Sequence, residues 1–376
     1  MATIHNFGNR QIMLRNKRFK SVFCFGISLT TRFKMLYIAC LILNHETITA
    51  TICVLYMSCV WSQKSIDFGP EAYAATITAE ELKSHLYIYA GDDFMGREAG
   101  TEGEIIAINY LKTEYESIGI EGGMPDGAYF MPMTLNSYRE NRALEASNVL
   151  AFIEGSQIPN EILVITAHLD HIGVEDDGQI NNGADDDGSG TVAILEIAEA
   201  FQQAVKDGKG PKRSVLFMHV TAEEKGLLGS KYYTDNPVYP LEDTVANLNI
   251  DMIGRIDELH ENNNNYMYLI GSDILSQDLH DVSAAMNDKY INLDLDYRYN
   301  DPTTKVFERG RYIENRYYYR SDHYNFAKNN VPVIFYFNGT HADYHAPTDT
   351  VEKIEYELLE KRTRLIFHTA WEMQIG

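Results

Sequence analysis

The chain has 376 residues, of which 45% are hydrophobic and 23% charged, and its 32 Lys and Arg face 54 Asp and Glu, for a formal net charge of −22. This composition is typical of a globular protein and excludes a disordered or fibrous one. Because so negative a surface repels phosphate backbones and anionic lipid head groups, we expect neither nucleic-acid nor membrane-surface partners.

The first 64 residues differ in charge from the rest of the chain. They hold eight Lys and Arg and one acidic residue, a net of +7, so the remainder carries −29. They also contain all four cysteines, Cys24, Cys40, Cys53 and Cys59. Their apolar runs, 35–43 and 50–61, are each shorter than the roughly 20 residues of a membrane-spanning helix.

We therefore predict that residues 1–64 are a targeting or signal segment, cleaved or retained, and that the protein is secreted or lies in a bacterial periplasm or cell envelope. No stable membrane span is expected. Residues 56–59 faintly resemble a lipobox, so a lipoprotein remains an alternative, and a buried N-terminal helix is another.

From residue 65 onward, helical and strand patterns alternate. Residues 79–90 and 101–118 have helical apolar spacing, and Thr101 and Glu104 are spaced as a capping box. Short apolar runs predict buried strands at 148–153, 162–167, 214–221, 245–253, 266–270 and 331–337. Further helices are predicted at 190–205, 227–234, 277–289, 322–329 and 351–373, and 296–319 is predicted to be a loop.

This alternation predicts an α/β fold in a single domain of residues 65–376. Its central sheet is expected to be mixed and largely parallel, with helices on both faces, which makes a three-layer sandwich. In such folds ligands bind at the carboxyl ends of the strands. The residues that follow each apolar run are therefore the place to look for function.

Polar clusters of one chemical kind follow these runs. They are His and carboxylate clusters without sulfur, at 168–171, 183–190, 222–226, 249–251 and 341–350. Imidazole and carboxylate together suit zinc or a similar divalent ion in a hydrolytic site with an open coordination position.

Each cluster also has an alternative interpretation. The acids at 185 and 187, with Ser189, Gly190 and Glu196, match the spacing of an EF-hand loop, although a strand and not a helix precedes them. Glu223 and Glu224 could be a solvated helix start. Asp251 lies within a predicted apolar strand, where an unpartnered carboxylate would be costly, so a structural explanation fits it less well.

The ordered motifs HxD at 168–170, GADDDxSG at 183–190, AEExGLLGS at 222–230, NxDMxG at 249–254 and YHxPxDT at 344–350 resemble the M28 family of zinc aminopeptidases. The resemblance covers roughly residue 80 to the C-terminus, and 93–101 resembles that family's N-terminal segment. Taken together the motifs are highly specific, although none would be so alone.

The resemblance implies a centre of two zinc ions bridged by Asp186. His168 and Asp251 would complete the binding of one ion, and Glu224 and His345 that of the other. Two imidazoles and three carboxylates nearly neutralise two dications, and a bridging water would be the nucleophile.

Further roles carry over by motif position. Glu223 would be the general base that takes the proton of the water, and Asp170 would orient His168. Tyr344 could donate a hydrogen bond to the oxyanion, or could simply be a packed tyrosine. The segment of Arg320, Ser321 and Asp322 resembles a helix start near the substrate pocket, and a structural cap is an equal alternative.

The function implied by the resemblance is hydrolysis of N-terminal residues from peptides with a free N-terminus. The negative charge would attract the α-ammonium group of such substrates. Alternatives are a glutaminyl cyclase-like enzyme, a carboxypeptidase or dipeptidase of the same fold, and a non-catalytic binding ectodomain.

Overall fold

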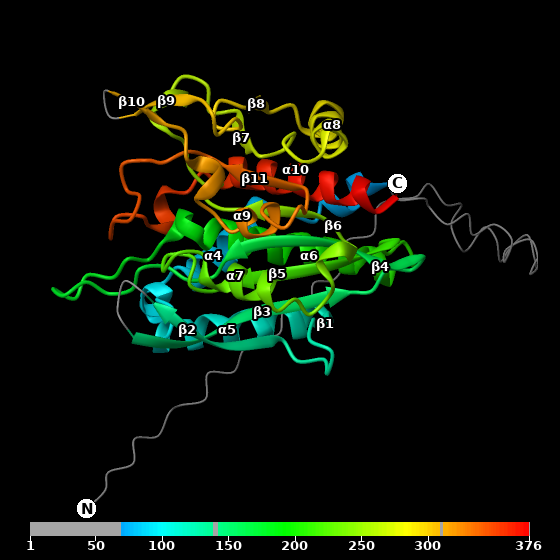
Figure 1. Cartoon of the computed structure of the whole chain (residues 1–376), viewed down its shortest axis with the longest axis horizontal. Helices are drawn as coiled ribbons and strands as arrows, with labels where there is room; N and C mark the ends of the chain where they lie inside the picture. Colours follow the sequence, from blue (N-terminus) through cyan, green and yellow to red (C-terminus); the bar gives the residue numbers. More distant parts are fainter. Residues whose placement is uncertain (1–68, 138–141, 309–310, 376) are drawn as a thin grey trace, which may run out of the picture. The chain divides into compact units, whose positions relative to one another are not determined.

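A mixed sheet forms the middle layer of the computed structural model, which describes residues 69–137, 142–308 and 311–375. The strands are β1 (Glu121–Gly122), β2 (Phe130–Ser137), β3 (Arg142–Ile153), β4 (Ile158–His168), β5 (Arg213–Val220), β6 (Thr244–Ile250), β7 (Tyr266–Ile270), β8 (Asp294–Asp296) and β11 (Val333–Phe337). Their order is β1-β3-β5-β4-β6-β11-β7-β8, with β2 paired to β3 (Figure 1). The mixed α/β fold is confirmed.

Four strands at the centre, β5, β4, β6 and β11, run parallel to one another. On one side β3 is antiparallel to β5, and on the other β7 is antiparallel to β11. The carboxyl ends of the four parallel strands therefore meet at one edge of the sheet, and this edge carries the polar clusters.

Helices cover both faces of the sheet. Side chains that alternate along β4 enter two separate apolar clusters, with Leu163 and Ile165 in one and Ile162 and Val164 in the other. The first cluster includes residues of α3 (Pro70–Ala74), α4 (Ala79–Tyr89), α5 (Glu102–Ile118), α6 (Gly190–Lys206), α8 (Gln277–Met286) and α10 (Tyr356–Ile375). The second includes residues of α7 (Leu228–Asp235) and α9 (His323–Ala327). Burial on both faces explains why the central strands are continuous apolar runs.

The predicted capping box of α5 does not form. Thr101 precedes the helix, but its hydroxyl donates to the carbonyl of Glu98 and caps no helical N–H. The carboxylate of Glu104 is buried and accepts hydrogen bonds from Thr221 Oγ1 at 2.5 Å, Ser147 N at 3.2 Å and Gly100 N at 2.6 Å. Glu104 thus joins α5 to β3 and β5, a tertiary role that local spacing does not reveal.

The predicted loop 296–319 contains a hairpin. Strands β9 (Lys305–Glu308) and β10 (Arg311–Glu314) pair in antiparallel fashion as a separate two-stranded sheet (Figure 1). Residues 68–376 form one compact unit. The predicted targeting segment falls in residues 1–68, outside the described part, and in the described part no helix is long and apolar enough to cross a bilayer.

Candidate metal centre

The five predicted metal ligands come together at the carboxyl edge of the parallel strands. His168 is the last residue of β4, and Asp251 directly follows β6, so Asp251 lies at the strand end and not inside the strand as predicted. Glu224 follows β5, Asp186 lies in the tight turn Ala184–Ser189 before α6, and His345 lies in the loop after β11.

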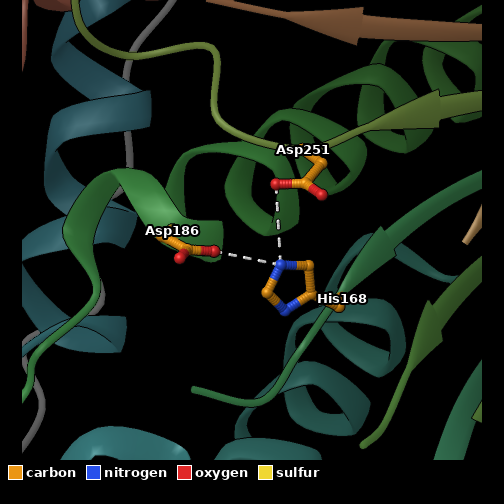
Figure 2. Close-up of side chains that lie close together, drawn as sticks. All are labelled: His168, Asp186 and Asp251. Atoms are coloured by element: carbon orange, nitrogen blue, oxygen red, sulfur yellow. Dashed lines mark ion pairs between the residues drawn. The ribbon is translucent and has the colours of Figure 1, made fainter. Parts of the chain in front are cut away.

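His168, Asp186 and Asp251 form one compact group of buried donors. His168 Nε2 lies 3.1 Å from Asp186 Oδ1 and 3.6 Å from Asp251 Oδ1 (Figure 2). Figure 2 shows both carboxylates directed at the same ring nitrogen. Nitrogen and oxygen donors that converge in this way are suited to one divalent ion.

A second group of candidate ligands lies near the other carboxylate oxygen of Asp186, Oδ2. His345 Nε2 is 3.2 Å from Asp186 Oδ2 and 3.1 Å from Glu224 Oε2. His171, which sequence reasoning did not select, has its Nδ1 2.9 Å from Glu224 Oε1 and 3.9 Å from Asp186 Oδ2. The only sequence signal for His171 was its place in the cluster 168–171.

The electrostatics of the centre favour a bound dication. Burial alone would raise the pKa of Asp186, but hydrogen bonds from His168 and His345 hold it well below its usual range. Burial would lower the pKa of His345, yet the carboxylates of Asp186 and Glu224 raise it to about 10. A metal ion bound between these groups would take the place of the imidazole protons, so the residues present fit a metal centre.

The carboxylates of Asp185 and Asp187, which flank Asp186, accept hydrogen bonds from backbone N–H groups. Asp187 accepts hydrogen bonds from the backbone N–H groups of His168, Gly190 and Met252 at 3.0–3.1 Å. Asp185 accepts from Gly254 N at 2.6 Å and from the imidazole of His341 at 3.1 Å. These carboxylates are committed to protein donors, which is contrary to the EF-hand alternative.

Asp349, in the final motif, holds the turn itself. Its Oδ2 accepts hydrogen bonds from the backbone N–H groups of Asp185 at 3.0 Å and Asp186 at 3.1 Å. Asp349 is fully buried, and its pKa is raised to about 6, first by burial and then by the charge of Asp185. It therefore ties the loop that carries His345 to the turn that carries Asp186.

Asp170 contacts both His168 and the segment of Glu223 and Glu224. His168 Nδ1 is 3.0 Å from the backbone carbonyl of Asp170 and 3.8 Å from its carboxylate. The carboxylate accepts hydrogen bonds from the backbone N–H groups of Glu223 at 3.1 Å and Glu224 at 3.4 Å. Its side chain thus positions the Glu223–Glu224 segment, whereas its backbone oxygen orients His168.

A cavity of about 350 Å³, counting space open to solvent, lies against the centre. Glu223 lines it together with His168, Asp186 and Asp251, and burial raises the pKa of Glu223 well above its usual value. Its apolar wall consists of Met252, Tyr317, Phe335 and Phe337.

The predicted catalytic residue Tyr344 and the predicted substrate-binding residue Arg320 also line this cavity and a neighbouring hollow of about 1270 Å³. Burial raises the pKa of Tyr344, so its hydroxyl stays a donor. Ser321 and Asp322 line neither hollow. Both are buried, Ser321 accepts a hydrogen bond from Asn249, and Asp322 accepts one from Ser230.

Arg97 holds the loop that connects His168 to Asp186. Its guanidinium is fully buried, lies 4.8 Å from the centre of the Tyr89 ring, and donates to four backbone carbonyls. The acceptors are Leu169, Tyr89, Asn182 and Gly183, at 2.6–3.3 Å. Only the planar fork of an arginine reaches so many acceptors from one buried position.

The comparisons with known proteins identify the family. The sequence profile of peptidase family M28 matches residues 148–370, and the chain belongs to this family. It is 31% identical over 195 residues to leupeptin-inactivating enzyme 1 of Streptomyces exfoliatus. This alignment covers 50% of this chain and 40% of that protein. It is 27% identical to a probable leucine aminopeptidase of Trichophyton verrucosum, over 60% of this chain and 57% of the relative. The match thus spans less than two thirds of either relative.

Solved structures share the fold. The LapA aminopeptidase of Legionella pneumophila superposes with a TM-score of 0.62 at 23% identity, over 82% of this chain and 74% of that one. BSAP, a zinc aminopeptidase from Bacillus subtilis, gives 0.59 at 16% identity, over 79% and 95%. The glutaminyl cyclase of Bacteroides thetaiotaomicron gives 0.57 at 18%, over 78% and 98%, so the fold alone does not separate these activities.

Arg97→Lys should destabilise the protein. A lysine cannot reach all four carbonyls, and each buried carbonyl left without a donor costs about 1–3 kcal/mol, so we expect the free energy of unfolding to fall by about 2–4 kcal/mol. Denaturant unfolding measures this. Arg298, which also lies over a tyrosine ring but is 41% exposed, is the control, and Arg298→Lys should change stability by less than about 0.5 kcal/mol. Equal losses in both variants would contradict this role of Arg97.

Proposed function

We propose that this protein is a zinc-dependent aminopeptidase that removes N-terminal residues from peptides. The observation that carries the proposal is the position of Asp186, whose two oxygens each face a different histidine and a different carboxylate. Membership of peptidase family M28 supports peptide hydrolysis. The names of relatives, among them leucine aminopeptidases, support action at the N-terminus.

Two zinc ions are proposed, with Asp186 shared between them. His168 and Asp251 would hold one ion, and Glu224 and His345 the other. Bound there, the ions would polarise the scissile carbonyl and lower the pKa of the attacking water.

Glu223 is the proposed general base. It lines the cavity next to His168 and Asp251, and its backbone is held by Asp170. In this position its carboxylate can take a proton from water and deliver it to the nitrogen of the leaving amine.

Tyr344 is proposed to stabilise the oxyanion of the tetrahedral intermediate. Its ring stacks on His345 with 3.9 Å between centroids, which fixes the ring at the cavity wall. Since its raised pKa keeps the hydroxyl protonated, the hydroxyl can donate a hydrogen bond to developing negative charge.

The cavity also suggests how a peptide is oriented. Glu223 lines it and is not a proposed metal ligand, so its carboxylate would attract an α-ammonium group. Arg320 lies on the wall shared with the larger hollow and is the proposed substrate-binding member of its segment. We further propose a secreted or envelope location, on the basis of the basic, cysteine-containing segment 1–64.

The full-length protein loaded with zinc should release the first residue of a short peptide with a free amino terminus, and should leave the N-acetylated twin intact. Mass spectrometry of the products measures both reactions. Equal cleavage of both peptides, or release from the carboxyl end, would contradict aminopeptidase action and favour a carboxypeptidase. Cyclisation of an N-terminal glutamine without hydrolysis would instead indicate a glutaminyl cyclase.

Glu223→Gln should keep the metal and lose activity. The amide cannot accept the proton of the attacking water, so kcat should fall by about 10²–10⁴-fold. Steady-state kinetics and metal analysis measure the two effects. Glu224→Gln is the matched control, because the change is the same one residue along, and it should weaken zinc binding as well. Near-normal activity of Glu223→Gln would exclude Glu223 as the base.

A further inference from the structure

His171 has a buried imidazole whose polar neighbours are the carboxylates of Glu224 and Asp186. The residue is fully buried, and neither ring nitrogen makes a hydrogen bond with any residue in the described parts of the chain. Buried polar groups are nearly always hydrogen-bonded, so an exception of this kind needs an explanation. The proposed metal centre, on which this inference rests, supplies one.

The protein fixes this ring firmly in place. The backbone N–H of His171 donates to the carbonyl of Arg97 at 3.3 Å, and the guanidinium of Arg97 donates to Gly183 on the far side of the loop. A Cβ atom at Gly183, where φ is +55°, would lie 2.6 Å from the His171 ring. A glycine is thus required there for the ring to fit beside the Asp186 turn.

The contact between His171 and Glu224 does not have the geometry of a hydrogen bond. Nδ1 lies 2.9 Å from Oε1, yet the ring N–H is not directed at that oxygen. His171 Nδ1, an oxygen of Asp186 and an oxygen of Glu224 all lie within 4.8 Å of one another. Ligand atoms about 2.0–2.2 Å from a zinc ion have separations of roughly 3–4 Å, which the observed 2.9 Å and 3.9 Å bracket.

The two halves of the centre differ in their access to the cavity. The cavity is lined by His168, Asp251 and Glu223, but by none of His171, Glu224 or His345. His345 approaches its half from an exposed loop, with 37% of its side chain accessible, whereas His171 is buried beneath. The half with His168 therefore lines substrate space, whereas the other half is buried at His171 and exposed at His345.

We propose that His171 is a fourth protein ligand of the metal ion held by Asp186, Glu224 and His345. This ion would then have four protein donors, whereas the ion at His168, Asp186 and Asp251 would have three. The site with four donors would fill first and release its ion slowly. The site with three donors would exchange its ion more readily.

The most direct test is a crystal structure of the zinc-loaded full-length protein with anomalous diffraction at the zinc edge. We expect His171 Nδ1 within about 2.0–2.1 Å of one zinc ion. A separation above about 3 Å would overturn the proposal and would make His171 a residue that only orients Glu224.

Zinc titration of the metal-free variants gives a second, independent result. His171→Ala should weaken the tighter class of sites by more than about 100-fold, the upper end of what loss of an outer hydrogen-bond partner costs, and should leave the weaker class unchanged. His368→Gln, at a buried histidine of α10 whose ring stacks on Tyr290, is the control and should keep both classes. Two unchanged classes in His171→Ala would overturn the proposal.

These measurements do not depend on peptide cleavage. Zinc coordinated by His171 in a protein that cleaves no peptide would uphold the ligand and reject the aminopeptidase. Release of N-terminal residues by a protein in which His171 lies far from zinc would uphold the aminopeptidase and reject the ligand. If His171→Ala does not fold, the structure of the unmodified protein still decides.

Discussion

The buried carboxylate of Asp186 imposes the constraint on which the rest of the site depends. A charge taken out of water is costly unless opposite charges and hydrogen bonds surround it, and here two imidazoles lie 3.1–3.2 Å from its two oxygens. Its backbone is held by Asp349, and the neighbouring Asp187 ties the same turn to the ends of β4 and β6. Much of the polar network near the sheet edge keeps this one side chain in place.

The parallel strands make the convergence possible. Each delivers its next residues to the same edge, and the chain must then turn away sharply. Ala222, Met252 and His345 adopt left-handed backbone conformations, with φ of 54°, 58° and 55°. Such conformations are unfavourable for residues other than glycine and cluster at functional sites, where the surrounding structure enforces them. The scaffold thus bears strain at or close to the candidate metal ligands.

Much of the fold could be predicted from the sequence because the central strands are buried on both faces and are therefore continuous apolar runs. Strand β2 was missed, although its burial alternates, because Pro132 within it argues against a strand. The capping box of α5 was wrong because Glu104 is recruited by β3 and β5, which local spacing cannot reveal.

For the site too, the sequence predicts the features that follow from local pattern and misses those that depend on contacts between distant segments. The clusters after the strands and the family resemblance led to five candidate ligands, which the structure brings together. The carboxylate of Asp170 and the ring of His171 depend on how the loop between β4 and α6 folds around Arg97. Ser321 and Asp322 follow Arg320, which lines the cavity, but their own side chains are buried in the interior. These roles come from contacts between distant segments and not from spacing along the chain.

The central claim, that Asp186 serves two metal ions, is tested most directly by native mass spectrometry of the zinc-loaded full-length protein and two variants at the same free zinc concentration. We predict two zinc ions in the unmodified protein, one in Asp251→Asn, and none in Asp186→Asn. Retention of one tightly bound ion by Asp186→Asn would show that the carboxylate is not shared and would contradict the account.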